Sequence, residues 1–153
     1  MRLISFLFVV AIAAAAQTNS NVQTFGMVGI AAGQTARLNV LNVGGQGQAV
    51  ECIASMIFVD DQGALLKTNT FKMRPGRSVS LDLVADVDLG LGTNDRRQIR
   101  AVLARLPGEA PQNAPTCVLA PTLEIFDRFT GRTSIVMVNT TPIPQTLAPA
   151  TQP

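Results

Sequence analysis

The feature that most constrains the fold is a two-residue alternation of apolar and polar side chains over residues 77–84. The apolar members are Val79, Leu81 and Leu83, and the polar members between them are Ser78, Ser80 and Asp82. Because successive side chains of a β-strand point to opposite faces, this alternation predicts a strand with one buried face and one face in water. The turn pair Pro75-Gly76 directly precedes it.

Other segments of the chain also have the length and composition of strands. Turn residues rich in Gly, Pro, Asp and Asn separate them about every eight to twelve residues. They cover residues 22–31, 35–43, 50–59, 65–67 with 70–73, 97–106, 118–127 and 133–138. Residues 50–59 are nearly all apolar, which predicts a central strand covered on both faces. The alternation in 35–43 changes phase at Leu41, which predicts a bulge or a change of neighbouring strand, and Pro121 predicts a break in 118–127.

Residues 97–106 fit two structures. A helix capped by Asp95 would have an apolar side made of Ile99, Val102, Leu103 and Leu106. A strand would instead place Ile99, Ala101 and Leu103 on one face. Because every other segment is typical of a strand, we predict a strand here. The complete pattern predicts an all-β chain that folds as an antiparallel β-sandwich of about eight strands.

The N-terminal residues resemble an export signal. A positive residue, Arg2, precedes an apolar run that only Ser5 interrupts, and the small residues at 14–16 form a cleavage site before Gln17. The alternative is an uncleaved anchor, but the run is shorter than the roughly 20 residues of a spanning helix. We therefore expect a signal peptide over 1–16, a sandwich domain over 17–139 and a disordered Thr/Pro-rich tail over 140–153. The mature protein would be secreted or periplasmic, without a membrane span.

Both cysteines, Cys52 and Cys117, lie in the predicted mature part. An even number of cysteines in an oxidising compartment favours a disulfide. A bridge that closes so long a loop stabilises the fold by about 4 kcal/mol in the chain-entropy description. The alternative is a pair of buried free thiols.

The composition argues against several classes of function. The chain has no His, which is the commonest general base and metal ligand. Without Arg2 the predicted mature chain has 11 basic and 10 acidic residues, a net charge of +1. This balance argues against a nucleic-acid partner, which requires a strong positive field.

Five groups of residues point to one kind of protein. They are Phe25 to Ile30, Gly33 to Val40, Phe58 to Asp60 with Gln62-Gly63, Pro75-Gly76 before the alternating segment, and Glu124 to Asp127 with Thr130 to Thr133. Together they resemble small exported bacterial proteins, mostly uncharacterised, that have an immunoglobulin-like β-sandwich. The resemblance implies that fold and implies no catalytic or ligand-binding residues. This chain lacks the buried Trp of antibody domains, and its cysteines need not match their bridge.

The segment 86–95 is the foremost candidate for chemistry. Its Asp and Asn side chains offer oxygen ligands for a calcium ion: Asp86, Asp88, Asn94 and Asp95. It departs from the helix-loop-helix calcium pattern, because Gly90 and Arg97 stand at the fifth and twelfth positions. Asp, Asn and Gly are also the usual residues of turns, so a polar surface loop is the favoured interpretation.

Two weaker candidates remain. Glu124 and Asp127 with Asp60 or Asp61 would be paired carboxylates for glycoside hydrolysis, but nothing in the sequence brings them together. Arginines cluster at positions 96, 97, 100 and 105 and would suit a phosphate or an acidic polysaccharide, although a solvated strand face is the favoured interpretation.

We therefore expect an exported, non-catalytic sandwich module without a cofactor. It would act by binding or structural interaction with a protein or another component of the cell envelope. One alternative is a subunit of a surface assembly, because sheet edges can pair with other chains. Another is a calcium-dependent or hydrolytic module that uses the 86–95 loop. A flat surface with one exposed apolar patch would favour binding, and a deep pocket lined by carboxylates would favour an enzyme.

Overall fold

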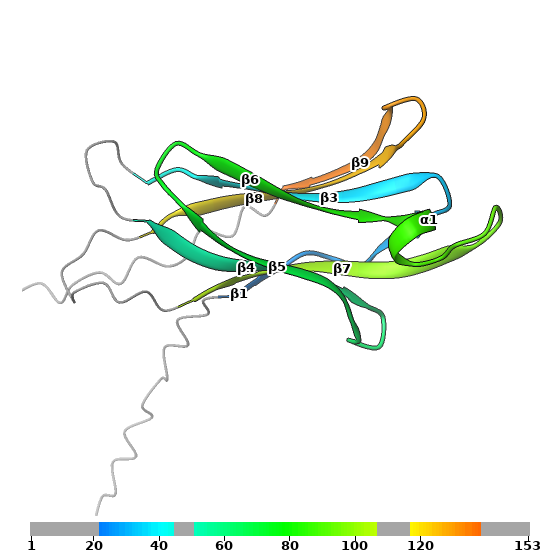
Figure 1. Ribbon diagram of the computed structural model, residues 1–153, viewed down its shortest axis with the longest axis horizontal. Coiled ribbons are helices and arrows are strands. Elements are labelled where there is room, and N and C mark those ends of the chain that lie inside the picture. Colours follow the sequence, from blue (N-terminus) through cyan, green and yellow to red (C-terminus); the bar gives the residue numbers. More distant parts are fainter. Residues whose placement is uncertain (1–21, 45–50, 107–116, 139–153) are drawn as a thin grey trace, which may run out of the picture. The chain divides into compact units, whose positions relative to one another are not determined.

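The computed structural model describes residues 22–44, 51–106 and 117–138 (Figure 1). The predicted signal peptide and the predicted tail lie outside these residues. The described part consists of nine strands and one short helix: β1 (Val22–Thr24), β2 (Val28–Ala31), β3 (Gln34–Asn42), β4 (Cys52–Asp60), β5 (Leu65–Met73), β6 (Ser78–Val84), α1 (Ala85–Asp88), β7 (Arg96–Arg105), β8 (Leu119–Asp127) and β9 (Thr133–Val138). The predicted all-β class is confirmed.

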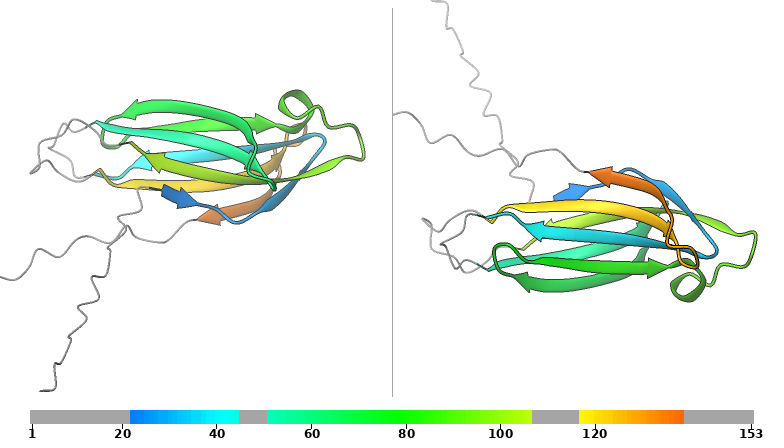
Figure 2. Two further views of the ribbon diagram at one scale, coloured as in Figure 1. Left: turned by 90° about the horizontal axis from the view of Figure 1, so that it is seen from below. Right: turned by 90° about the horizontal axis from the view of Figure 1, so that it is seen from above.

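The strands form two antiparallel sheets that lie face to face (Figure 1). The five-stranded sheet has the order β1-β7-β4-β5, and β2 also pairs with β7. The four-stranded sheet has the order β6-β3-β8-β9, which can be followed from green through cyan and yellow to orange in the right panel of Figure 2. The architecture is therefore a two-layer sandwich, as the spacing of strands and turns predicts.

The core lies between the sheets and is filled by every second residue of the long strands. β4 alternates strictly between buried and half-buried residues along its whole length. The largest fully buried apolar side chains are Phe58, Ile30, Leu38, Met56, Leu83, Ile99, Leu123 and Ile125. In β6, Leu81 and Leu83 are buried and Val79 packs against the same core, so the alternation noted in the sequence faces the expected way.

The prediction of a strand at residues 97–106 is confirmed. β7 pairs with β4 on one side and with β1 and β2 on the other, so three strands fix its extended form. Its buried residues are Ile99, Ala101 and Leu103, and Val102 on the opposite face is partly exposed.

The segment 22–31 forms two strands where the sequence predicts one. The chain leaves β1 after Thr24, and Phe25 is buried while its N–H donates to the Ala101 carbonyl at 3.0 Å. The chain then joins β7 again as β2. This division explains why the structure has one strand more than predicted.

Two predictions about strand irregularities and one about burial are wrong. β3 keeps its register past Leu41, which is 41% exposed, because Asn42 takes the next buried position. β8 continues through Pro121, which lies opposite Val40 and outside the part of β8 that pairs with β9. β4 is buried on one face only, so its apolar outward side chains stay partly exposed.

Candidate functional site

The 86–95 loop carries the chain from β6 in one sheet to β7 in the other, and it begins with the one-turn helix α1. The Asp86 carboxylate accepts a hydrogen bond from Gly33 N at 2.6 Å and lies 3.6 Å from the Arg128 guanidinium. Gly33 has a positive φ of 80° and belongs to the turn before β3, and Arg128 belongs to the turn after β8. Asp86 therefore holds two neighbouring turns.

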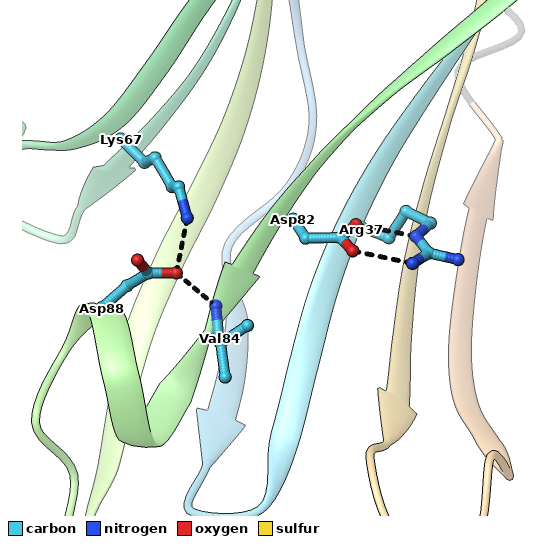
Figure 3. A network of polar contacts seen from close by, with 5 residues as sticks. All are labelled: Arg37, Lys67, Asp82, Val84 and Asp88. Atoms are coloured by element: carbon cyan, nitrogen blue, oxygen red, sulfur yellow. Dashed lines mark hydrogen bonds and ion pairs between the residues drawn. The ribbon is translucent and has the colours of Figure 1, made fainter.

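Asp88 is the second carboxylate of this loop, and it is engaged within the fold (Figure 3). Its Oδ2 accepts from Lys67 Nζ and from Val84 N, both at 2.7 Å. Burial by itself would raise the pKa of Asp88, but these two hydrogen bonds outweigh it and hold the pKa below its ordinary value. Asp88 thus ties α1 to β5.

Asp95 and Asn94 lie at the far end of the loop. Asp95 Oδ2 accepts from Gly92 N at 2.8 Å, which closes a local turn, and Asn94 is exposed. The carboxylates of Asp86, Asp88 and Asp95 each accept from a different part of the chain. Within residues 22–44, 51–106 and 117–138, no three His, Cys, Asp or Glu side chains come together in a group that could hold a metal ion.

The carboxylates considered for hydrolysis belong to different sheets. Asp60 ends β4, whereas Glu124 and Asp127 belong to β8. Asp60 accepts from Ala64 N at 2.8 Å, from Gln62 N at 3.0 Å and from Arg97 at 3.0 Å.

Asp60 and Asp127, which each accept hydrogen bonds from backbone N–H groups of the turn that follows them, have lowered pKa values. The hydrogen bond from Ala64 N is the main reason that the pKa of Asp60 lies below its ordinary value, and the bonds from Gln62 and Arg97 add to it. The backbone N–H of Thr130 does the same for the pKa of Asp127. These aspartates stabilise the turns after β4 and β8.

The arginine cluster is divided between the two faces of β7. Arg97 pairs with Asp60, and Arg105 donates to the Cys117 carbonyl at 2.7 Å. Arg96 lies over Gly29, where the Cβ of any other residue would overlap its guanidinium. Arg100 is half-buried, and its Nε has no hydrogen-bond partner in the structure.

The predicted disulfide is confirmed, with the two Cα atoms of Cys52 and Cys117 5.5 Å apart. It joins the first residue of β4 to the segment that leads into β8, and so it links the two sheets. A second link lies at Asn42 in β3, which is buried and donates from Nδ2 to the carbonyl of Met73, the last residue of β5. Sequence reasoning missed Asn42.

The outer face of the four-stranded sheet is polar at its centre, whereas its β9 edge carries the exposed Val136 and Val138. Its central contact is a two-pronged ion pair in which Arg37 Nε and one terminal nitrogen each lie 2.7 Å from an oxygen of Asp82 (Figure 3). The Arg37 guanidinium also lies 5.0 Å from the centre of the Phe126 ring. The hydrogen bond to Asp82 raises the pKa of Arg37. A polar outer face is normal for a sandwich in water.

The outer face of the five-stranded sheet is different, because its centre is mainly aliphatic, with the hydrogen-bonded hydroxyls of Ser55 and Thr70 as a polar pair within it. We call this surface the aliphatic face; it is turned to the viewer in the left panel of Figure 2 and consists of Ile53, Ile57, Val59, Val102, Ala104 and Val22. Ile57 lies directly opposite Val102, and Val22 lies directly opposite Ala104. Val22 is 48% exposed, and the other members are half-buried. Their side chains touch no second layer of described strands.

Basic residues surround the aliphatic face. Lys72 on β5 and Arg96 and Arg100 on β7 point to this side. The outward positions of the described strands in this sheet include no carboxylate. This surface therefore has an apolar centre and a positive rim.

A comparison with protein-family models finds none that matches this chain, and a search of curated proteins finds no match. Of the helices in the described ranges, none has the length and apolar character needed to cross a bilayer.

Proposed function

We propose that the protein is a non-catalytic interaction module that binds another protein through the aliphatic face. The observation that carries this proposal is the contrast between the two outer faces. At its centre one face has the Arg37–Asp82 ion pair, and the other has the adjoining side chains of Ile57, Val59 and Val102. A contiguous exposed apolar patch bordered by polar residues is typical of a binding surface.

The side chains of the aliphatic face indicate what kind of surface the partner must have. Its central residues, such as Ile57 and Val102, require a flat apolar surface in contact with them. The positive rim favours acidic side chains at the border of the partner's contact surface.

We further propose that the sandwich is of immunoglobulin type and that the protein works outside the cytoplasm, secreted or in the periplasm of a bacterium. The pairings of β3 with β6 and of β4 with β7 support the fold type, because they correspond to the central pairs of the two immunoglobulin sheets. The chain departs from that fold in two ways: β1 and β2 join β7 instead of β3, and β8 joins β3 instead of β7. The disulfide supports an oxidising compartment.

Affinity capture with matched variants tests the binding function. The immobilised mature protein is exposed to an extract of the source cell envelope, in parallel with Ile57→Asp and with Thr122→Asp. Thr122 lies on the outer face of the other sheet, so its replacement is the control. We expect one protein to be retained by the wild type and by Thr122→Asp, and lost with Ile57→Asp because a charge would meet the apolar centre.

The captured protein must then bind the purified module directly, with the same dependence on position 57. The binding function is refuted by a set of captured proteins that is the same for all three baits. A drop in melting temperature for Ile57→Asp would require repeating the capture with Ile57→Ser, which retains a polar outer strand position without a charge.

A further inference from the structure

We propose that the edge strand β9 pairs with β9 of a second copy of this chain. The pairing is antiparallel and joins two four-stranded sheets into one continuous sheet. It uses a different surface from the aliphatic face, so it stands independently of the proposed binding function.

Among the strands described, β9 is the one edge strand longer than four residues that carries neither a charged residue nor Pro, and its ladder with β8 is regular from Ile135 to Val138, with a register shift at Ser134. Exposed sheet edges usually carry charges or Pro, or are very short, because unpaired backbone groups would otherwise recruit another strand. The edge strand β5 carries Lys67 and Lys72, and β6 carries Asp82. β1 and β2 have only three and four residues. The sequence of β9, Thr-Ser-Ile-Val-Met-Val, has no charge, no Pro and no Gly.

The outward side chains of β9 are exposed aliphatic groups. Val136 and Val138 are each 61% exposed. On its inner side β9 pairs with β8 from Thr122 to Phe126, and no other described strand pairs with it. Its outer backbone groups are thus placed to form a ladder with an added strand, the arrangement by which sheets recruit a peptide or a second chain.

Symmetry favours a second copy as the added strand. A two-fold axis through Val136 places Ile135 opposite Met137 of the second copy, so that these residues of the regular part of β9 meet on the same face of the sheet. Ile135 and Met137 already pack against the core, so the two cores become continuous across the axis.

The absence of charged residues from β9 also favours a second copy as the partner. A charged residue on a two-fold axis meets the same charge of the second copy, which destabilises the pair. β9 has no such residue. The nearest acidic side chain on the outer face is Glu124, opposite Val136 on β8, and its carboxylate accepts from the Thr133 hydroxyl. The two Glu124 residues would be three strand spacings apart, about 14 Å, where salt largely screens their repulsion.

The pairing of six-residue strands gives a small interface. We therefore expect a reversible dimer with a dissociation constant on the order of micromolar. Sedimentation velocity over a concentration series measures it. The wild type should shift from monomer to dimer, and Val136→Lys should remain monomeric throughout the range. Ser80→Lys is the control, because Ser80 is an exposed outward residue on β6 at the opposite edge of the same sheet; it should dimerise as the wild type does.

A second variant tests the register and does not depend on how well a charge is tolerated. Val136→Cys should form a disulfide-linked dimer on mild oxidation, because residues at the axis bring their Cβ atoms to about 5 Å. Val138→Cys lies away from the axis, with no cysteine opposite it, and should not cross-link, and Ser80→Cys measures random collision.

The proposal is overturned by a wild type that stays monomeric, which would leave β9 to a different protein's strand, or by a Val136→Lys variant that dimerises normally. Equal cross-linking of all three cysteine variants would overturn the register. Ile57→Asp should leave dimerisation unchanged, so that failure of this proposal and failure of the aliphatic face are observed separately.

Discussion

At the scale of single residues, Asp60 shows how this chain uses a carboxylate inside a turn. Its side chain is only 6% exposed, yet each oxygen has a donor: the backbone of the turn on one side and Arg97 on the other. Gly63 completes the turn with a φ of 83°. The sequence predicts a turn after the strand at 50–59, but it does not show that Asp60 is buried, because Arg97 is far away along the chain.

The lowered pKa values predict how stability depends on pH. Asp60 and Asp127 have folded-state pKa values below those of the unfolded chain, so each stabilises the fold fully above the unfolded pKa of about 3.9. That contribution is lost as the pH falls through the folded-state value. We expect the urea concentration at the unfolding midpoint to decrease as the pH is lowered below about 4. Because the chain has no His, this midpoint should stay constant between about pH 5 and 8.

Urea unfolding at a series of pH values checks this, with Asp60→Asn as the comparison. The variant should be less stable than the wild type at neutral pH, and the difference should shrink in acid. A wild-type midpoint that rises on acidification would contradict the expected sign.

Asn42 shows a limit of sequence reasoning at the same scale. The pattern treats Leu41 as the next buried residue because it is apolar, but the amide of Asn42 occupies the buried position. An amide can be buried there because Met73 supplies a carbonyl acceptor. That acceptor becomes visible only once β3 and the end of β5 are adjacent in space.

At the scale of elements, β7 illustrates how pairing decides between two local patterns. The spacing of Ile99, Val102 and Leu103 fits a helix as well as a strand. The structure has a strand because β1, β2 and β4 supply backbone partners on both sides, and those partners lie far away in sequence. From the sequence alone, a strand is favoured here only because all the other segments have the patterns of strands.

Two substitutions in β7 should have very different costs. Ile99 is fully buried, so Ile99→Asp should destabilise the protein by several kcal/mol, on the order of 3 to 5 kcal/mol, or prevent folding. Val102 is partly exposed on the aliphatic face, so Val102→Asp should cost about 1 kcal/mol. Chemical denaturation measures both. Similar losses for the two variants would mean that the two faces of β7 are buried alike.

The 86–95 loop gives a prediction about calcium. The carboxylates of Asp86 and Asp88 already accept hydrogen bonds from Gly33, Val84 and Lys67, and no third ligand group lies with them among the described residues. Millimolar calcium, compared with a chelator, should therefore leave the melting temperature unchanged. An increase of several degrees would show that a calcium site exists here.

At the scale of the whole molecule, the two layers are tied together at one end by Cys52–Cys117 and by Asn42. The class of fold, most strands and the disulfide could be predicted because they depend on local periodicity and on cysteine count. The aliphatic face could not. The apolar run of β4 includes residues of this face, but the same run is typical of a strand that is covered on both sides. Only the arrangement of the sheets shows that Ile53, Ile57 and Val59 have no second layer over them.

Removal of the disulfide should weaken the fold without changing it. Cys52→Ala combined with Cys117→Ala should lower the free energy of unfolding by about 4 kcal/mol, because the bridge restricts a long loop in the unfolded chain. Denaturation with circular dichroism should show the same β-type spectrum at a lower midpoint. Mass measurement of natively expressed protein after alkylation, without reduction, should show no free thiol, and two alkylated cysteines would contradict the bridge.

The same bridge also sets how the domain would respond to stretching. A force applied at Val22 and Val138 passes through the cross-link and bypasses the 65-residue separation between its cysteines, which includes β5, β6, β7 and most of β4. At about 3.4 Å per residue, roughly 220 Å of chain cannot be drawn out. Only β1 to β3 on one side and β8 and β9 on the other can unravel, about 50 residues or 170 Å in all. Under tension the domain would extend by this limited length, and the disulfide would then carry the force and prevent further extension.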